Sequence, residues 1–125
     1  MIIDCHSFPS VPLPYEDDQE PVRPDICIGT DSYHTPRRLV TETAAIFEKA
    51  GFRVVLNRPF SGTIVPMKFY RREPAVSSIM IELNRGLYMD EKAGVPLPQF
   101  EILRRRLDGC LMGLKLAFEG IGRKI

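Results

Sequence analysis

Residues 77–90 contain an apolar run that is interrupted by a single carboxylate. Glu82 lies between Ile81 and Leu83 in the sequence SSIMIELNRGLYMD. Apolar residues at both odd and even positions are typical of an interior strand covered on both faces. A glutamate in such a strand loses hydration, which raises its pKa and suits it to proton transfer near neutral pH. Glu82 is therefore the first catalytic candidate.

The polar residues that follow favour a site at the end of this strand. Side-chain alternation places Glu82 and Asn84 on one face, and Leu83 and Arg85 on the other. An acid, an amide and a guanidinium group therefore lie at one strand end. Ligands bind at strand ends in open α/β sheets, so we expect a site here.

The other segments predict an α/β fold. Thr35 and Pro36 supply an N-cap and a first-turn proline to an amphipathic helix that stops at Gly51. A strand before and after this helix favours a parallel pair with a right-handed crossover. A second helix begins at Pro98 and covers one sheet face. The expected strands besides the Glu82 strand are 1–9, 25–29, 52–56 and an edge strand at 63–65, and the apolar stripe of the second helix is Phe100, Leu103, Leu107, Leu111, Leu114, Phe118 and Ile121.

Two connections are predicted to be loops. Residues 10–24 contain four prolines and four acidic residues, which block a helix or a central strand. This segment is either a solvated connection or a lid beside a pocket, because long ordered loops are often functional. Residues 92–98 form the second loop. In the helix that follows, Gly109 and Gly113 are expected to allow a close approach to the sheet.

Composition excludes several classes of protein. A chain of 125 residues with 44% hydrophobic and 26% charged residues fits one globular domain spanning 1–125. A net charge of +1 offers no field to attract nucleic acid or an anionic membrane. The three cysteines form no CxxC pattern, and neither a signal peptide nor an apolar run of transmembrane length is present. We therefore expect a cytoplasmic protein.

Few catalytic arrangements fit the residues. Cys5 and His6 are adjacent on a strand and point to opposite faces, so they cannot act as nucleophile and base. Neither GxGxxG nor GxxxxGK[ST] occurs, which leaves no nucleotide motif. A metal hydrolase remains, with a histidine at one strand end and an isolated glutamate at another.

Four segments carry a family resemblance. They are DCHS at 4–7, RPDICIGTD at 23–31, NRPFSG at 57–62 and IELNRGLYMDE at 81–91. In this order they resemble the C-terminal half of the N-formylglutamate amidohydrolase family. The resemblance implies the phosphorylase/hydrolase-like α/β fold shared with zinc carboxypeptidases and aspartoacylases. We thus expect a mixed sheet flanked by helices that lacks the N-terminal elements of the family fold.

The resemblance also implies an activity. The family hydrolyses N-acyl amide bonds, in the type case N-formyl-L-glutamate to formate and glutamate in histidine degradation, at one zinc ion. His6 would be a zinc ligand, and Glu82 the general base that passes a proton from metal-bound water to the leaving amine. Asp4 would orient the imidazole. The implied partner is a small N-acyl amino acid.

Guanidinium groups would hold this dicarboxylate substrate in forked geometry. Arg85 and Arg23 match arginines in the family pattern. Asn57 and Arg58 resemble the asparagine–arginine pair that holds a terminal carboxylate in related carboxypeptidases. These four residues are the predicted substrate-binding residues.

One departure from the family affects the metal site. The other two zinc ligands of the family, a histidine and a glutamate, precede the DxHS motif, and only His6 is matched here. A catalytic zinc ion normally has three protein ligands. His34 could join His6 and Asp31 in a makeshift site, or it could be a polar turn residue. His6 itself could be a core histidine, and Glu82 could be the structural partner of an arginine.

Three hypotheses follow. The first is an N-formylglutamate amidohydrolase-like enzyme that depends on His6 and Glu82. The second is a catalytically inactive module that binds carboxylates without metal. The third is an inert fragment that forms a homo-oligomer through exposed strand edges.

Overall fold

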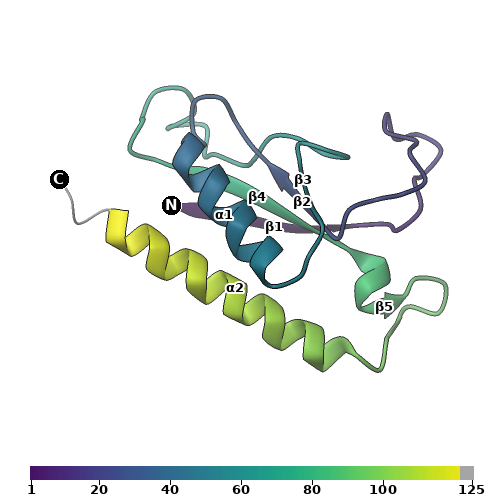
Figure 1. Ribbon diagram of the computed structural model, residues 1–125. Helices are drawn as coiled ribbons and strands as arrows, with labels where there is room; N and C mark the ends of the chain where they lie inside the picture. Colours follow the sequence, from purple (N-terminus) through teal and green to yellow (C-terminus); the bar gives the residue numbers. More distant parts are fainter. Residues whose placement is uncertain (122–125) are drawn as a thin grey trace.

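A computed structural model describes residues 1–121 and contains a four-stranded mixed sheet (Figure 1). The strand order is β1-β4-β2-β3, so β4 is interior, as the apolar run around Glu82 predicted. β4 pairs parallel with β1 and antiparallel with β2, and β2 pairs parallel with β3. The strands are β1 (Ile2–Phe8), β2 (Ile26–Gly29), β3 (Val54–Leu56) and β4 (Ser78–Asn84).

Two helices, α1 (Arg37–Lys49) and α2 (Phe100–Ile121), pack side by side on one face of this sheet (Figure 1). Burial of their apolar stripes supplies most of the driving force for folding. The predicted contribution of Ile121 lies outside the residues whose side chains are described. The buried cluster between helices and sheet contains Ile26, Ile28, Leu39, Phe47, Phe52, Ile79, Ile81, Leu103, Cys110 and Leu114.

The opposite face of the sheet, called here the polar face, carries several polar side chains beside the buried Met80 and Phe8, and loops contact it. Asp4 and His6 of β1, Glu82 of β4 and Cys27 of β2 lie on this face because they are register partners or two residues apart. The Cys27 thiol donates to the Phe60 carbonyl at 3.1 Å, which holds the loop after β3 against the sheet. In the part of the chain that the structure describes, helices therefore cover one face of the sheet only.

Helix α1 follows the predicted range but not the predicted cap. The helix begins at Arg37 after Pro36, and no side chain caps it. Thr35 Oγ1 instead donates to the Ser78 carbonyl at 2.7 Å, which ties the start of α1 to β4. The predicted Thr35 N-cap is therefore wrong, because a tertiary acceptor takes the hydroxyl. The strand after α1 begins at Val54, since Phe52 turns into the core.

Three further expectations differ from the structure. Residues 63–65 form no strand, since the Ile64 N–H donates to the Asp4 side chain at 3.0 Å instead of to a strand. The expected loop 92–98 contains β6 (Val95–Pro96), which pairs with β5 (Met89–Asp90) after the short 3-10 helix η1 (Arg85–Leu87). A Cβ added at Gly113 would contact Ile46 of α1, and one at Gly109 would meet no atom within 4 Å, so neither glycine brings α2 close to the sheet.

Within residues 1–121, neither helix combines the length and apolar character needed to cross a bilayer.

Candidate functional site

His6 and Glu82 are direct neighbours across two strands. The parallel register of β1 and β4 pairs His6 with Glu82, and the antiparallel register of β4 and β2 pairs Glu82 with Cys27. Paired residues of adjacent strands project to the same face, about 4.8 Å apart along the sheet. The imidazole and the carboxylate that the sequence selected therefore share one surface, although 76 positions separate them.

The environment of Glu82 favours the protonated form of its carboxyl group. Its exposed fraction is 8%, and this loss of hydration raises the pKa of its carboxyl group above the ordinary value. The charges of His6 and Arg85 oppose the rise in pKa, and those of Asp4 and Glu16 add to it. A raised pKa favours proton uptake by a carboxyl group and is common at sites that transfer protons.

Asp4 fixes the orientation of His6. Asp4 Oδ1 lies 2.7 Å from His6 Nε2, and Asp4 Oδ2 accepts the Ile64 N–H at 3.0 Å. The carboxylate is thus held from both sides, while the His6 side chain remains 51% exposed. A carboxylate that pairs with an accessible imidazole is the usual arrangement behind a metal-ligating or proton-transferring histidine.

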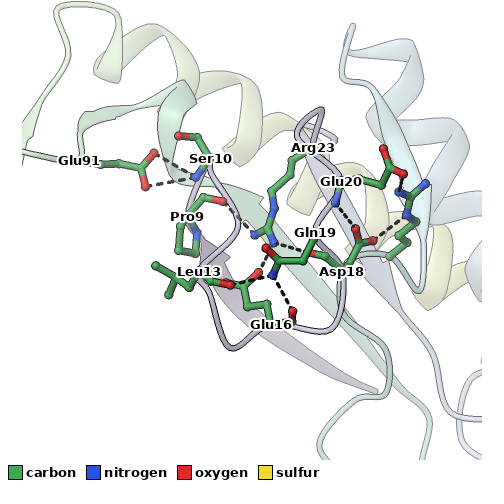
Figure 2. Close-up of polar contacts among 10 residues, drawn as sticks. Pro9, Ser10, Leu13, Glu16, Asp18, Gln19, Glu20, Arg23 and Glu91 are labelled. Carbon is green, nitrogen blue, oxygen red and sulfur yellow. Dashed lines mark hydrogen bonds and ion pairs between the residues drawn. The ribbon is translucent and has the colours of Figure 1, made fainter.

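Arg23 organises the loop between β1 and β2 (Figure 2). It is 5% exposed and donates to the Glu16 carboxylate, to the Pro9 carbonyl at 3.1 Å and to the Asp18 carbonyl at 3.3 Å. Its guanidinium also lies 5.7 Å from the centre of the Phe8 ring. A substrate carboxylate would have to compete with Glu16 for this arginine.

Arg58 lies at a more open position beside the same loop. Its Nε donates to the Asp18 carboxylate at 2.7 Å, and its side chain is 53% exposed. The neighbouring Asn57 makes a different contact, since the Asn57 Oδ1 accepts the Thr30 N–H at 2.9 Å. Arg58 and Arg23 line a cavity of about 230 Å³ together with Arg53, Asp18, Glu20, Val22, Pro24, Val55 and Pro59.

Arg85 lies apart from that cavity. Its Nε donates to Ser7 Oγ at 3.1 Å and its Nη2 to the Ser7 carbonyl at 3.2 Å, both at the end of β1. The structure therefore brings two of the predicted arginines together at one cavity and places the third beside β1. The assignment of all three to substrate binding stays a prediction.

His34 is a buried structural histidine in this fold. It is 1% exposed, with Nδ1 2.8 Å from the Val76 carbonyl and Nε2 accepting the Arg71 N–H at 2.8 Å. Asp31 accepts the backbone N–H groups of Tyr33 and His34. Both ring nitrogens are thus occupied, which agrees with the interpretation of His34 as a turn residue.

The side chains described do not complete a zinc site. Among residues 1–121, no group of three or more histidine, cysteine, aspartate or glutamate side chains is placed to hold a metal ion. Catalytic zinc takes three protein ligands, and this chain offers one imidazole, with Asp4 hydrogen-bonded to it. One copy of this chain therefore does not fit the ion that the resemblance implies.

Sequence reasoning missed the carboxylate partners of the arginines. Glu16 pairs with Arg23, and Asp18 pairs with Arg58 across 40 positions. The available signal was the acidic patch in the proline-rich loop at residues 10–24, which also contains Arg23. Nothing in the sequence fixes which acid meets which arginine.

Comparison with known proteins agrees with the residue pattern. None of the curated proteins compared matches the chain. A crystal structure of N-formylglutamate amidohydrolase from Ralstonia eutropha JMP134 matches with a TM-score of 0.75 and 27% identity, over 98% of this chain and 44% of that one. The chain thus spans less than half the length of that relative. The family model described as N-formylglutamate amidohydrolase matches residues 1–89. The chain therefore belongs to the N-formylglutamate amidohydrolase family.

Proposed function

We propose that this chain supplies the proton-transfer residues of an enzyme that hydrolyses N-acyl amino acids, with N-formyl-L-glutamate as the substrate and formate and glutamate as the products. Family membership supports the reaction class. The single observation that carries the proposal is the pairing of His6 with the buried Glu82 on one polar face.

In this mechanism Glu82 moves one proton. Its carboxylate oxygen takes a proton from the attacking water as the water oxygen bonds to the acyl carbon. The same oxygen then gives that proton to the amide nitrogen as the C–N bond breaks, so that the amine leaves protonated. Burial favours this role because a raised pKa brings the protonated and ionised forms of Glu82 closer in free energy.

His6 contributes an imidazole that Asp4 holds in place beside Glu82. Zinc is the proposed cofactor, and His6 is the ligand that this chain would offer to it. One imidazole does not hold a catalytic zinc ion. The proton-transfer steps above therefore use no metal.

The cavity lined by Arg23 and Arg58 is the proposed site for the substrate carboxylates. Guanidinium groups bind carboxylates in forked geometry, and a substrate carboxylate would displace Glu16 from Arg23 or Asp18 from Arg58. Arg58 is the more available of the two, because its exposed ion pair is weak and exchanges readily.

The test is formate release from N-formyl-L-glutamate, with zinc supplied, by the wild type and Glu82→Gln. The isosteric amide cannot carry the proton, so we expect a rate loss of about 10²-fold or more. Glu48→Gln, which makes the same change on the exposed surface of α1, is the control and should keep the wild-type rate. Equal rates for wild type and Glu82→Gln, or no turnover by the wild type, would reject the proposal.

A second candidate is a carboxylate-binding module without catalysis. The incomplete metal ligand set favours it. Binding of N-formylglutamate that survives both chelator and Glu82→Gln, in a protein that releases no formate, would select this candidate.

A further inference from the structure

The loop between β1 and β2, residues 10–24, places a carboxylate on each of two arginines of the cavity (Figure 2). Glu16 pairs with Arg23 in a buried position, where the side chains of the two residues are 8% and 2% exposed. Asp18 accepts a hydrogen bond from Arg58 Nε at 2.7 Å in a more open position. Two carboxylates of one loop thus occupy the guanidinium groups that are proposed to bind the carboxylates of the substrate.

The contacts of the loop leave part of the Arg23 guanidinium unused. Its Nη2 donates to the Glu16 carboxylate and to the Asp18 carbonyl, and its Nη1 donates to the Pro9 carbonyl. Its Nε is buried and has no hydrogen-bond partner among residues 1–121. Nε and Nη2 form one edge of a guanidinium group, which a carboxylate can grip with both oxygens. Glu16 binds this edge through Nη2 alone, so a free carboxylate could make one hydrogen bond more than Glu16 does.

Glu16 also lies near the proposed proton carrier. The Arg23 guanidinium that binds it lies 5.7 Å from the centre of the Phe8 ring and 5.8 Å from that of Phe60, and Phe8 is the last residue of β1. Burial is the main cause of the raised pKa of Glu82, and the negative charge of Glu16 adds to it, so the two carboxylates lie within electrostatic reach. Glu16 therefore holds an anion position close to the candidate site.

The tip of the loop, residues 13–19, is held together by its own hydrogen bonds. Gln19 Nε2 donates to the Leu13 carbonyl at 2.9 Å and to the Glu16 carbonyl at 2.6 Å. The Glu16 N–H donates to the Leu13 carbonyl at 3.0 Å. None of these three bonds involves an arginine, so the tip can leave both arginines without losing them. A dicarboxylate bound to the two guanidinium groups would replace the ion pairs that this release breaks.

We propose that the loop tip is an autoinhibitory segment, in which Glu16 and Asp18 occupy Arg23 and Arg58 until a dicarboxylate displaces them and releases the tip. This role of the loop rests on the proposed binding of substrate carboxylates at these arginines. It goes beyond that proposal because the loop becomes a built-in competitor, whose carboxylates weaken the binding of a ligand. A loop that served only to shape the cavity would have the opposite effect.

Calorimetric titration of the full chain with glutarate tests the competition. Glutarate carries two carboxylates and no amide bond, so the measurement does not depend on hydrolysis. Glu16→Gln keeps an oxygen acceptor for Arg23 and removes the charge. We expect it to bind glutarate about 10-fold more tightly than the wild type, the gain for a tip that is open in about one molecule in ten. Asp17→Asn is the matched control and should bind as the wild type does, because Asp17 is an exposed acid of the same loop that forms no ion pair within residues 1–121.

A measurement on the wild type tests the displacement without any substitution. The side-chain carboxyl carbons of Glu16 and Asp18 can be followed by NMR as unlabelled glutarate is added to the labelled protein. We expect both signals to move toward the positions of free side chains as the arginines exchange partners. This measurement decides the question if Glu16→Gln fails to fold.

Several results would overturn the proposal. They are equal or weaker glutarate binding by a folded Glu16→Gln, an equal gain for Asp17→Asn, a Glu16 signal that stays in place at saturating glutarate, and no binding of glutarate at all. Each of these leaves formate release from N-formyl-L-glutamate, and hence the proposed function, to its own test. Displacement of Glu16 by glutarate in a protein that releases no formate would instead reject the proposed hydrolysis and support the competition.

Discussion

The two faces of the sheet are built from the same strands but differ in role: one packs into the core and the other holds the candidate site. Ile79 and Ile81 of β4 point into a cluster that α1 and α2 close from water. Glu82, between Ile81 and Leu83, points to the other face, where loops cover it and His6 is its neighbour. The comparison teaches that alternation along one strand separates the residues that stabilise this fold from those proposed to act on a substrate.

Substitutions in the core under the helix-covered face should have the largest effect on stability. Phe47 is 1% exposed and packs within the core cluster, so Phe47→Ala should lower the free energy of unfolding by about 3–5 kcal/mol. Leu116→Ala, on the exposed side of α2, is the control and should change little. Urea denaturation followed by circular dichroism measures both. A small loss for Phe47→Ala would place the core elsewhere.

A smaller loss of stability is expected for a substitution in the loop between β1 and β2. Arg23→Met leaves the Glu16 carboxylate buried without its partner, at a cost of about 3 kcal/mol. Methionine keeps apolar contact with Phe8 and Phe60, which limits the loss. The same denaturation experiment tests this expectation. An unchanged midpoint would mean that the ion pair does not hold the loop.

Glu82→Gln, in contrast, should increase the stability of the protein at pH 7. The raised pKa of Glu82 means that the folded state binds its proton more tightly than the unfolded chain does, so this carboxyl group lowers stability as pH rises above its ordinary pKa. Removing the charge should therefore raise the melting temperature at pH 7, and the gain should vanish below the ordinary carboxyl pKa. Melting curves from pH 3 to pH 8 check this. Destabilisation at pH 7 would indicate a structural ion pair instead.

The smallest change in stability is expected for Arg58→Met. Arg58 is 53% exposed and its pairs with Asp18 and Glu20 lie at the surface, so the unfolding midpoint should not move measurably. Substrate affinity should fall nevertheless, because the methionine cannot bind a carboxylate. Calorimetric titration with N-formylglutamate separates the two effects. Unchanged affinity would remove Arg58 from the substrate site.

Residue patterns were sufficient for much of the fold. The apolar run around Glu82 predicted the interior strand, and the two amphipathic stripes, with their proline and glycine boundaries, predicted both helices. The edge strand at 63–65 was wrong because a side chain, Asp4, takes the Ile64 N–H, and sequence patterns do not reveal such long-range acceptors.

The candidate site was predictable only in part. His6 and Glu82 were selected by motif and burial, and their register partnership brings them together. The pairing of Arg23 with Glu16 and of Arg58 with Asp18 was not foreseen, because each depends on how a proline-rich loop folds back on the sheet. Short polar contacts of this kind follow from tertiary structure rather than from periodicity.

The most direct test of the central claim is the pKa of Glu82 itself, measured by following its side-chain carboxyl carbon by NMR as pH changes. The account predicts a pKa above that of an ordinary glutamate, and a further rise in His6→Gln, because the imidazole charge opposes the upward shift. A pKa at or below the ordinary value, unaffected by His6→Gln, would contradict the claim that Glu82 is a buried proton carrier facing His6.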